Sequence, residues 1–330
     1  MKSDSMLPTK SNKFENHNLQ IIRNVRVIVI CLLSLLIPFD FIYLVIKYFG
    51  YEYFLWRLPL YFFLTFQFCI NLYLFNVKNK DNNLKEWESK LGICNSIENK
   101  NSLNELNIDN SVKEDLLEKN DRNTKVKGRL NFCDKCNVKC YIRSQHCPIC
   151  DICVLRKDHH CFFFGRCVGI SNHRYFFLTC FWLSLGCGYI LTYYYSILDK
   201  IVFSSCQWKW TYLFNTFGFI TSCVINVEES ISNNLLMIIL YLHLIAFFTG
   251  TIFGILHLYY ILKGITSFNN ILMSNKKFDI KPDGKTINER LRFIFGNHWY
   301  INILLPNYWE EIIIEKDMID NIFFPLSLDD

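Results

Sequence analysis

Four long apolar runs constrain the fold of this chain more than any other feature of its sequence. They cover residues 27–46, about 54–75, 175–198 and 235–262. Each holds roughly the 20 mainly apolar residues that an α-helix needs to cross the hydrocarbon core of a bilayer, at about 1.5 Å per residue. The sequence therefore predicts an α-helical integral membrane protein with four transmembrane helices.

The distribution of basic residues predicts which way the loops face. Of the 35 Lys and Arg residues, 5 lie in residues 1–26, 18 in residues 76–174 and 8 in residues 263–330. Basic residues collect in cytosolic loops, so we expect a multi-pass protein with both termini and the 76–174 segment in the cytosol. A fifth helix within 201–225 would place the eight C-terminal basic residues outside and is disfavoured. The net charge of +5 is mainly a topology signal, and we expect no nucleic-acid partner.

The predicted segments follow from these runs and from composition. Residues 81–129 contain ten Asn, nine Lys or Arg and ten Asp or Glu among few large apolar side chains. Such a stretch buries too little apolar surface to offset the entropy lost on ordering. We expect an N-terminal tail (1–26), helices 1 and 2 (27–75), a flexible cytosolic insert (76–130), a cysteine-rich module (131–174), helices 3 and 4 (175–262) with a lumenal loop (199–234), and a cytosolic C-terminal region (263–330).

The cysteine-rich module contains eight of the 15 cysteines, all between residues 133 and 167. Cysteines in the reducing cytosol usually bind metal or react, and seldom form disulfides. The module also has little Leu, Ile or Val from which to build a core, so something other than apolar burial must stabilise it. Zinc bound by four Cys or His side chains, often with Cys-x2-Cys spacing, would do so.

The number of candidate ligands exceeds what two zinc ions require. With Cys140 set aside, the candidates are Cys133, Cys136, His146, Cys147, Cys150, Cys153, His159, His160, Cys161 and Cys167. Two tetrahedral sites use eight of these ten, so one Cys and one His remain. Cys140 and His173 could replace members of the set, and spacing alone does not decide which ligands share an ion. A purely structural module has no need of a surplus Cys and His next to Asp158, which favours a reactive thiol.

The module resembles the DHHC protein S-acyltransferases, the integral-membrane palmitoyltransferases. The matching pattern is Cys133-x2-Cys136-x6-Arg143-x2-His146-Cys147-x2-Cys150-x2-Cys153-x4-Asp158-His159-His160-Cys161-x5-Cys167-Val168-Gly169-x2-Asn172. The resemblance implies two structural Zn²⁺ ions, with ligand sets Cys133, Cys136, His146, Cys153 and Cys147, Cys150, His160, Cys167. It also implies that Cys161 is the nucleophile, that His159 is its base, and that Asp158 orients His159.

The resemblance further implies a ping-pong protein S-palmitoyltransferase. Cys161 would take the acyl group from palmitoyl-CoA or another long-chain fatty acyl-CoA and pass it to cysteines of membrane-associated proteins at the cytosolic face. The substrate-binding candidates are Arg143 for CoA phosphates, Phe163 for the acyl chain, and Thr266, Ser267 and Asn288 in motifs after helix 4. The expected partners are acyl-CoA, substrate proteins and the lipid bilayer, in an endomembrane (Golgi or ER) or the plasma membrane.

Some positions depart from the family pattern. Phe163 replaces Trp, Arg166 replaces Asn, Asn269 replaces Glu, and Cys140-Tyr141 replaces Lys-Pro. A non-catalytic, zinc-stabilised membrane scaffold or adaptor is the main alternative, and a transporter with zinc fingers is a weaker one. The Asp158-His159 pair beside a surplus Cys161 favours the enzyme, because a scaffold does not require it.

Overall fold

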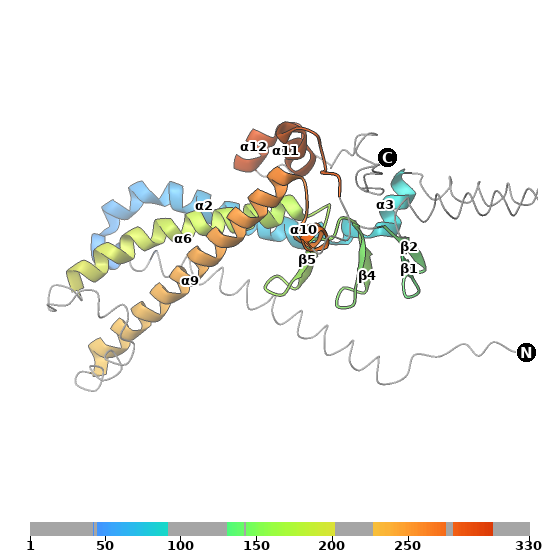
Figure 1. The fold of residues 1–330 in the computed structure, drawn as a ribbon. Helices are drawn as coiled ribbons and strands as arrows, with labels where there is room; N and C mark the ends of the chain where they lie inside the picture. The colour runs from blue at the N-terminus through green and yellow to red at the C-terminus, as the bar shows by residue number, and fades with distance from the viewer. Residues whose placement is uncertain are drawn as a thin grey trace, which may run out of the picture. The chain divides into compact units, whose positions relative to one another are not determined.

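The computed structural model describes residues 42, 45–91, 131–141, 143–201, 227–274 and 280–305. Its helices (Figure 1) are α2 (Tyr51–Val77), η1 (Lys80–Asn82), α3 (Leu84–Leu91), α6 (His173–Ile201), α9 (Val227–Lys263), α10 (Ser267–Ser274), α11 (Ile287–Phe295) and α12 (Trp299–Leu304). Two compact units are distinguished. The first takes its described residues from Leu72–Phe176 and His257–Asp330, and the second from Leu33–Asn71 and Phe177–Leu256.

Three of the described helices are long and apolar enough to cross a membrane. These spans are Leu55–Val77, His173–Ser196 and Ile238–Lys263. They correspond to the runs predicted at 54–75, 175–198 and 235–262, while the run at 27–46 lies almost wholly outside the described residues. The predicted lumenal loop, 199–234, is shorter in the structure because α6 continues to Ile201 and α9 begins at Val227.

Within the second unit, α6 and α9 approach each other closely at Gly250. A Cβ atom added to Gly250 would lie 2.9 Å from the Cys180 carbonyl oxygen and 3.1 Å from the Ser184 nitrogen, whereas one added to Gly254 would meet nothing within 4 Å. The Ser184 and Thr251 hydroxyl oxygens lie 2.6 Å apart at the same level. Small residues let membrane helices pack backbone to backbone, so Gly250 sets the spacing of this pair.

The cysteine-rich module in the first unit consists of three antiparallel hairpins that follow one another along the chain (Figure 1). Their strands are β1 (Asn131–Cys133), β2 (Val138–Cys140), β3 (Gln145–Cys147), β4 (Ile152–Val154), β5 (His159–Cys161) and β6 (Arg166–Val168). The first strand of each hairpin ends in a cysteine, at positions 133, 147 and 161, which are 14 residues apart.

The three hairpins share one turn. Four residues after each of these cysteines, a backbone N–H donates to the cysteine carbonyl oxygen at 2.8 Å. The donating residues have φ between 54° and 64°, a conformation that Asn, Asp and Gly adopt most easily. They are Asn137, Asp151 and Gly165. The module is therefore a threefold repeat of one 14-residue unit, which sequence reasoning missed although the ligand spacing carries it.

The first part of the predicted flexible insert, residues 76–130, has regular structure. The chain after α2 forms η1 and α3, and Asn82 is fully buried. The Asn82 carbonyl oxygen accepts from the Leu155 N–H at 3.0 Å, and its side-chain oxygen accepts from the Ser171 N–H at 2.8 Å. Leu84 and Trp87 are also buried. The polar composition of residues 80–91 did not indicate this structure, because one asparagine and two apolar side chains suffice to attach the segment to the module. Residues 92–130 lie outside the described residues.

The long helix α9 ends at Lys263. Gly264 follows with φ of 70°, and its N–H donates to the Ile261 carbonyl oxygen at 3.0 Å, an arrangement that ends a helix. Further along, the Thr286 hydroxyl oxygen accepts from the Glu289 N–H at 3.2 Å and caps α11. These two helix ends flank the described residues 264–274 and 280–286, which include Asp283.

Candidate functional site

Two groups of four side chains in the module bring their donor atoms within 4.8 Å of one another. The groups are Cys133, Cys136, His146, Cys153 and Cys147, Cys150, His160, Cys167. They coincide with the two ligand sets that the family resemblance implies. Three thiol sulfurs and one imidazole nitrogen are donors typical of structural zinc. Both groups could therefore hold a zinc ion.

The dimensions of the second group fit zinc closely. The His160 Nδ1 atom lies 3.5, 3.5 and 3.6 Å from the sulfurs of Cys147, Cys150 and Cys167. Zinc bonds of about 2.3 Å to sulfur and 2.0–2.1 Å to nitrogen, at tetrahedral angles, would separate nitrogen and sulfur by about 3.6 Å. In the first group, His146 Nδ1 lies 3.3 Å from the Cys136 sulfur and 4.0 Å from the Cys153 sulfur, a less regular arrangement around the same distance.

Each ligand group joins two successive hairpins. Two turn cysteines come from one hairpin, and a cross-strand His and Cys pair comes from the next. The pairs are His146 with Cys153 across β3 and β4, and His160 with Cys167 across β5 and β6. Metal at the first group would link the first hairpin to the second, and metal at the second group would link the second to the third. The ions would thereby replace the apolar core that the module lacks.

The threefold repeat explains why Cys161 belongs to neither group. Cys161 occupies in the third hairpin the position of Cys133 and Cys147 in the first two. Three residues further on, the third hairpin has Phe164 where the others have Cys136 and Cys150. The third turn thus lacks a second thiol, and it is followed by α6, so no fourth hairpin supplies a His and Cys pair. Cys161 remains a free thiol and is nearly buried, with 5 % of its surface exposed.

Strand geometry separates the two adjacent histidines. Alternate side chains of a strand point to opposite faces, so His160 in β5 faces one way while His159 and Cys161 face the other. The His159 Nδ1 atom lies 2.8 Å from the Asp158 Oδ1 atom, which leaves Nε2 available to the thiol. The His159 ring also contacts the Phe176 ring, with centroids 5.2 Å apart. The strand therefore assembles Asp158, His159 and Cys161 in the order carboxylate, imidazole, thiol.

The Asp158 carboxylate and the His159 imidazole each favour the charged form of the other. Burial alone would lower the pKa of His159, but its hydrogen bond with Asp158 and its interaction with Cys161 outweigh burial and raise the pKa to about 9. Burial alone would raise the pKa of Asp158, but the hydrogen bond with His159 and the nearby histidines hold it well below its usual range. A carboxylate, an imidazole and a thiol in this order are the groups that nucleophilic catalysis by cysteine uses.

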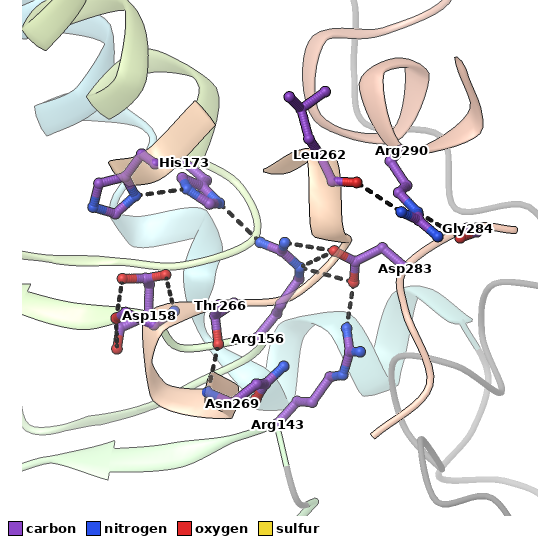
Figure 2. Close-up of polar contacts among 12 residues, drawn as sticks. Arg143, Arg156, Asp158, His173, Leu262, Thr266, Asn269, Asp283, Gly284 and Arg290 are labelled. Carbon is purple, nitrogen blue, oxygen red and sulfur yellow. Dashed lines mark hydrogen bonds and ion pairs between the residues drawn. The ribbon is translucent and has the colours of Figure 1, made fainter. Parts of the chain in front are cut away.

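Thr266 and Ser267, both predicted to bind substrate, make hydrogen bonds at the start of α10, close to Asp158 (Figure 2). The Ser267 N–H donates to Asp158 Oδ2 at 2.8 Å, and the Ser267 hydroxyl donates to Asp158 Oδ1 at 2.6 Å. The Thr266 hydroxyl oxygen accepts from the Asn269 N–H at 3.1 Å and caps α10. Ser267 therefore holds the Asp158 carboxylate from the start of α10, and Thr266 caps that helix.

A buried ion cluster lies next to this support, and sequence reasoning missed it. The Asp283 carboxylate accepts from Arg156 Nε at 3.1 Å and from Arg156 Nη2 at 2.6 Å, and it also accepts from Arg143 Nη1 (Figure 2). All three side chains are at most 1 % exposed. Burial would raise the pKa of Asp283, but the two guanidinium groups outweigh it and lower the pKa. Asp283 is 127 residues from Arg156 in sequence, so no local pattern could have indicated this pairing.

The cluster continues toward the reactive trio through two histidines. Arg156 Nη1 lies 2.9 Å from His173 Nδ1, and His173 Nε2 lies 3.0 Å from His257 Nδ1. The His257 ring is 5.5 Å from the His159 ring, centroid to centroid. A continuous set of contacts thus connects the segment after α10 with the base beside Cys161. His173 is part of this set of contacts and belongs to neither ligand group.

The structure does not bring the other predicted substrate-binding residues together around Cys161. Arg143 is fully buried against Asp283, so a contact with a CoA phosphate would require it to leave that partner. Phe163 lies in the turn of the third hairpin with 64 % of its surface exposed. The Asn288 side-chain oxygen accepts from Trp299 Nε1 at 3.1 Å. Nearby in α11, Arg290 donates to the Leu262 carbonyl oxygen at 2.6 Å and to the Gly284 carbonyl oxygen at 2.8 Å, and so links the end of α9 to the segment before α11.

These features define a protein with apolar helices long enough to span a membrane and a module with two candidate zinc sites and a free thiol beside an Asp and His pair. The family model described as DHHC palmitoyltransferase matches residues 126–274. This match covers the cysteine-rich module and the helices α6 and α9, and it confirms the resemblance seen in the sequence. A search of curated proteins finds no match.

Proposed function

We propose that this protein is a protein S-palmitoyltransferase in which Cys161 carries the acyl group. The observation that supports this most directly is the free Cys161 thiol, outside both ligand groups and beside the hydrogen-bonded Asp158 and His159 pair. The two zinc ions, when bound, supply structural cross-links between the hairpins and take no part in the chemistry.

The proposed reaction has two steps that use one sulfur. In the first, the Cys161 thiolate attacks the carbonyl carbon of the palmitoyl-CoA thioester, the bond from that carbon to the CoA sulfur breaks, and the CoA thiolate takes a proton from His159. In the second, a substrate cysteine gives a proton to His159 and attacks the acyl carbon, which releases Cys161 as a thiolate. Asp158 stays ionised and holds the tautomer and the orientation of His159 in both steps.

The aromatic residues after Cys161 supply a surface for the acyl chain in this proposal. Phe164 packs on Phe75 and Phe176, with ring centroids 5.4 and 5.8 Å away. Phe162 and Phe163 are 63 % and 64 % exposed, and we propose that they contact the acyl chain next to the thioester. Each methylene group taken out of water contributes about 0.8 kcal/mol, which favours long-chain fatty acyl-CoA as the donor.

The proposed setting is a membrane with the module at its cytosolic face. The positions of the basic residues support four spans with both termini cytosolic, and hence substrate proteins that are bound to the same membrane and offer cytosolic cysteines. A Golgi, ER or plasma membrane would satisfy these conditions equally well.

The proposal is tested by acyl labelling of the purified full-length protein. Wild type, Cys161→Ser and the control Cys69→Ser are incubated with an alkyne analogue of palmitoyl-CoA, and the zinc content of each is measured in parallel. Wild type and Cys69→Ser should carry hydroxylamine-sensitive label, and Cys161→Ser should carry none while retaining two zinc ions. Equal label in all three proteins would rule out Cys161 as the carrier. Two zinc ions with no label in wild type would favour the scaffold alternative.

A further inference from the structure

One cysteine of the module is neither a member of a ligand group nor part of the reactive trio. Cys140 ends strand β2 and is 7 % exposed. Its sulfur lies 3.4 Å from the sulfur of Cys153, a member of the first ligand group that is 1 % exposed. The first ligand group, with three sulfurs and one imidazole, therefore has a fourth sulfur next to one of its members.

The threefold repeat shows that packing does not require a sulfur at this position. The residues that correspond to Cys140 in the second and third hairpins, 14 and 28 positions later, are Val154 and Val168. Both valines are fully buried. A valine thus fits the end of the second strand in two of three hairpins, and only the first hairpin places a thiol there, against a ligand sulfur.

We propose that Cys140 and Cys153 form a redox pair that controls zinc at the first site. Oxidation by a peroxide would join the two sulfurs in a disulfide and release that zinc ion, and a thiol reductant would reverse the change. The inference rests on the assignment of zinc to the ligand groups and does not depend on the acyl-transfer reaction.

The reaction balances with hydrogen peroxide as the oxidant. The Cys153 sulfur, held as a thiolate by zinc, attacks one peroxide oxygen; the O–O bond breaks, and Cys153 becomes a sulfenic acid with release of hydroxide. The Cys140 sulfur then attacks the Cys153 sulfur, the S–O bond breaks, and water leaves with the Cys140 proton. Two electrons pass from the sulfurs to the peroxide, and the Zn–S bond to Cys153 is lost.

The Cys140 and Cys153 sulfurs need only a small movement to form a disulfide. A disulfide has an S–S bond of about 2.05 Å, so the two sulfurs must approach by about 1.4 Å from their 3.4 Å separation. Losing Cys153 leaves three donors at the first site, Cys133, Cys136 and His146. Closed structural zinc sites use four ligands, so the incomplete site should release its ion.

The expected consequence is local. The first hairpin would lose its metal link to the second, while the second ligand group, which ties the third hairpin and hence Cys161, keeps its four members. Oxidation should therefore release one zinc ion of two.

The test follows zinc release from the full-length protein in detergent. Reduced wild type and Cys140→Val, which installs the residue of the other two hairpins, should each hold two zinc ions by elemental analysis. On addition of hydrogen peroxide, a chromogenic chelator should report one zinc ion released from wild type, and release from Cys140→Val should be at least about tenfold slower. Tandem mass spectrometry should find the Cys140–Cys153 disulfide in wild type only, and reductant with added zinc should restore the second ion.

Three results would overturn the proposal. These are zinc release from Cys140→Val at the wild-type rate, a disulfide in wild type that does not join Cys140 to Cys153, and a reduced Cys140→Val protein with a single zinc ion, which would make Cys140 a ligand. If the variant fails to fold, the disulfide mapping in wild type decides alone. Failure of acyl labelling in the reduced protein would count against the proposed function and leave this inference intact.

Discussion

Removal of the Asp283 charge is the most informative perturbation of the first unit. Asp283 is the carboxylate shared by Arg143 and Arg156, and all three groups are buried. Asp283→Asn keeps the shape of the side chain but leaves two buried guanidinium groups without a counter-charge. Breaking a buried ion pair by removing one partner typically costs about 3–5 kcal/mol. Because the amide oxygen can still accept a hydrogen bond, we expect the lower end of this range.

The magnitude can be converted into a measurable shift. A loss of about 3 kcal/mol changes the unfolding equilibrium constant by roughly 150-fold. For a unit of this size, about 2–4 °C of Tm is lost per kcal/mol, so we expect Tm to fall by roughly 6–12 °C. Differential scanning fluorimetry of the detergent-solubilised protein measures this directly. Because the cluster reaches His159 through His173 and His257, the rate of acyl labelling should also fall.

Two variants test the physical reasoning behind the Asp283 prediction. Glu289→Gln changes an acidic residue of the same C-terminal segment that is partly exposed and hydrogen-bonds at the α11 cap, so Tm should change little. Adding Arg143→Met to Asp283→Asn removes one of the two uncompensated charges and should recover part of the lost Tm. An Asp283→Asn protein that melts within about 2 °C of wild type would refute the view that this ion cluster holds the segment in place.

Three further predictions concern other parts of the structure. Chelation of zinc should remove about 10 kcal/mol per ion from the folding of the module, seen as new protease cleavage in residues 131–174 while the helical circular dichroism persists; an unchanged cleavage pattern after metal loss would contradict this. Gly250→Val should lower Tm because its side chain meets the Cys180 and Ser184 backbone, whereas Gly254→Val should not; equal shifts would disprove the close approach. Ser267→Ala removes a hydroxyl donor to the Asp158 carboxylate and should slow acyl labelling roughly tenfold, with Ser267→Thr restoring the rate; a full rate in the alanine variant would exclude this support.

Local sequence patterns carried much of the prediction. Apolar runs of membrane-spanning length indicated the helices, because the bilayer thickness fixes how many residues each needs. The Cys-x2-Cys spacings indicated the two zinc sites, and the surplus of one Cys and one His beside Asp158 indicated the reactive thiol. A 14-residue repeat was also present in the sequence, at Cys133, Cys147 and Cys161, and could have shown why the third hairpin leaves its cysteine free.

Only the tertiary structure revealed the contacts between distant segments. Asp283 meets Arg156 across 127 positions, and Asn82 meets Ser171 across 89. Such pairings have no periodicity that a single sequence can display, because they depend on how the chain folds back and not on the spacing of neighbours. The same holds for the contact between the Cys140 and Cys153 sulfurs. It also holds for Arg143, which was predicted to contact CoA phosphates and which the fold buries against the Asp283 carboxylate. The sequence alone determined the membrane-length helices and the candidate ligands, since these depend on local spacing and composition, and the fold decided which buried charges and polar groups became partners.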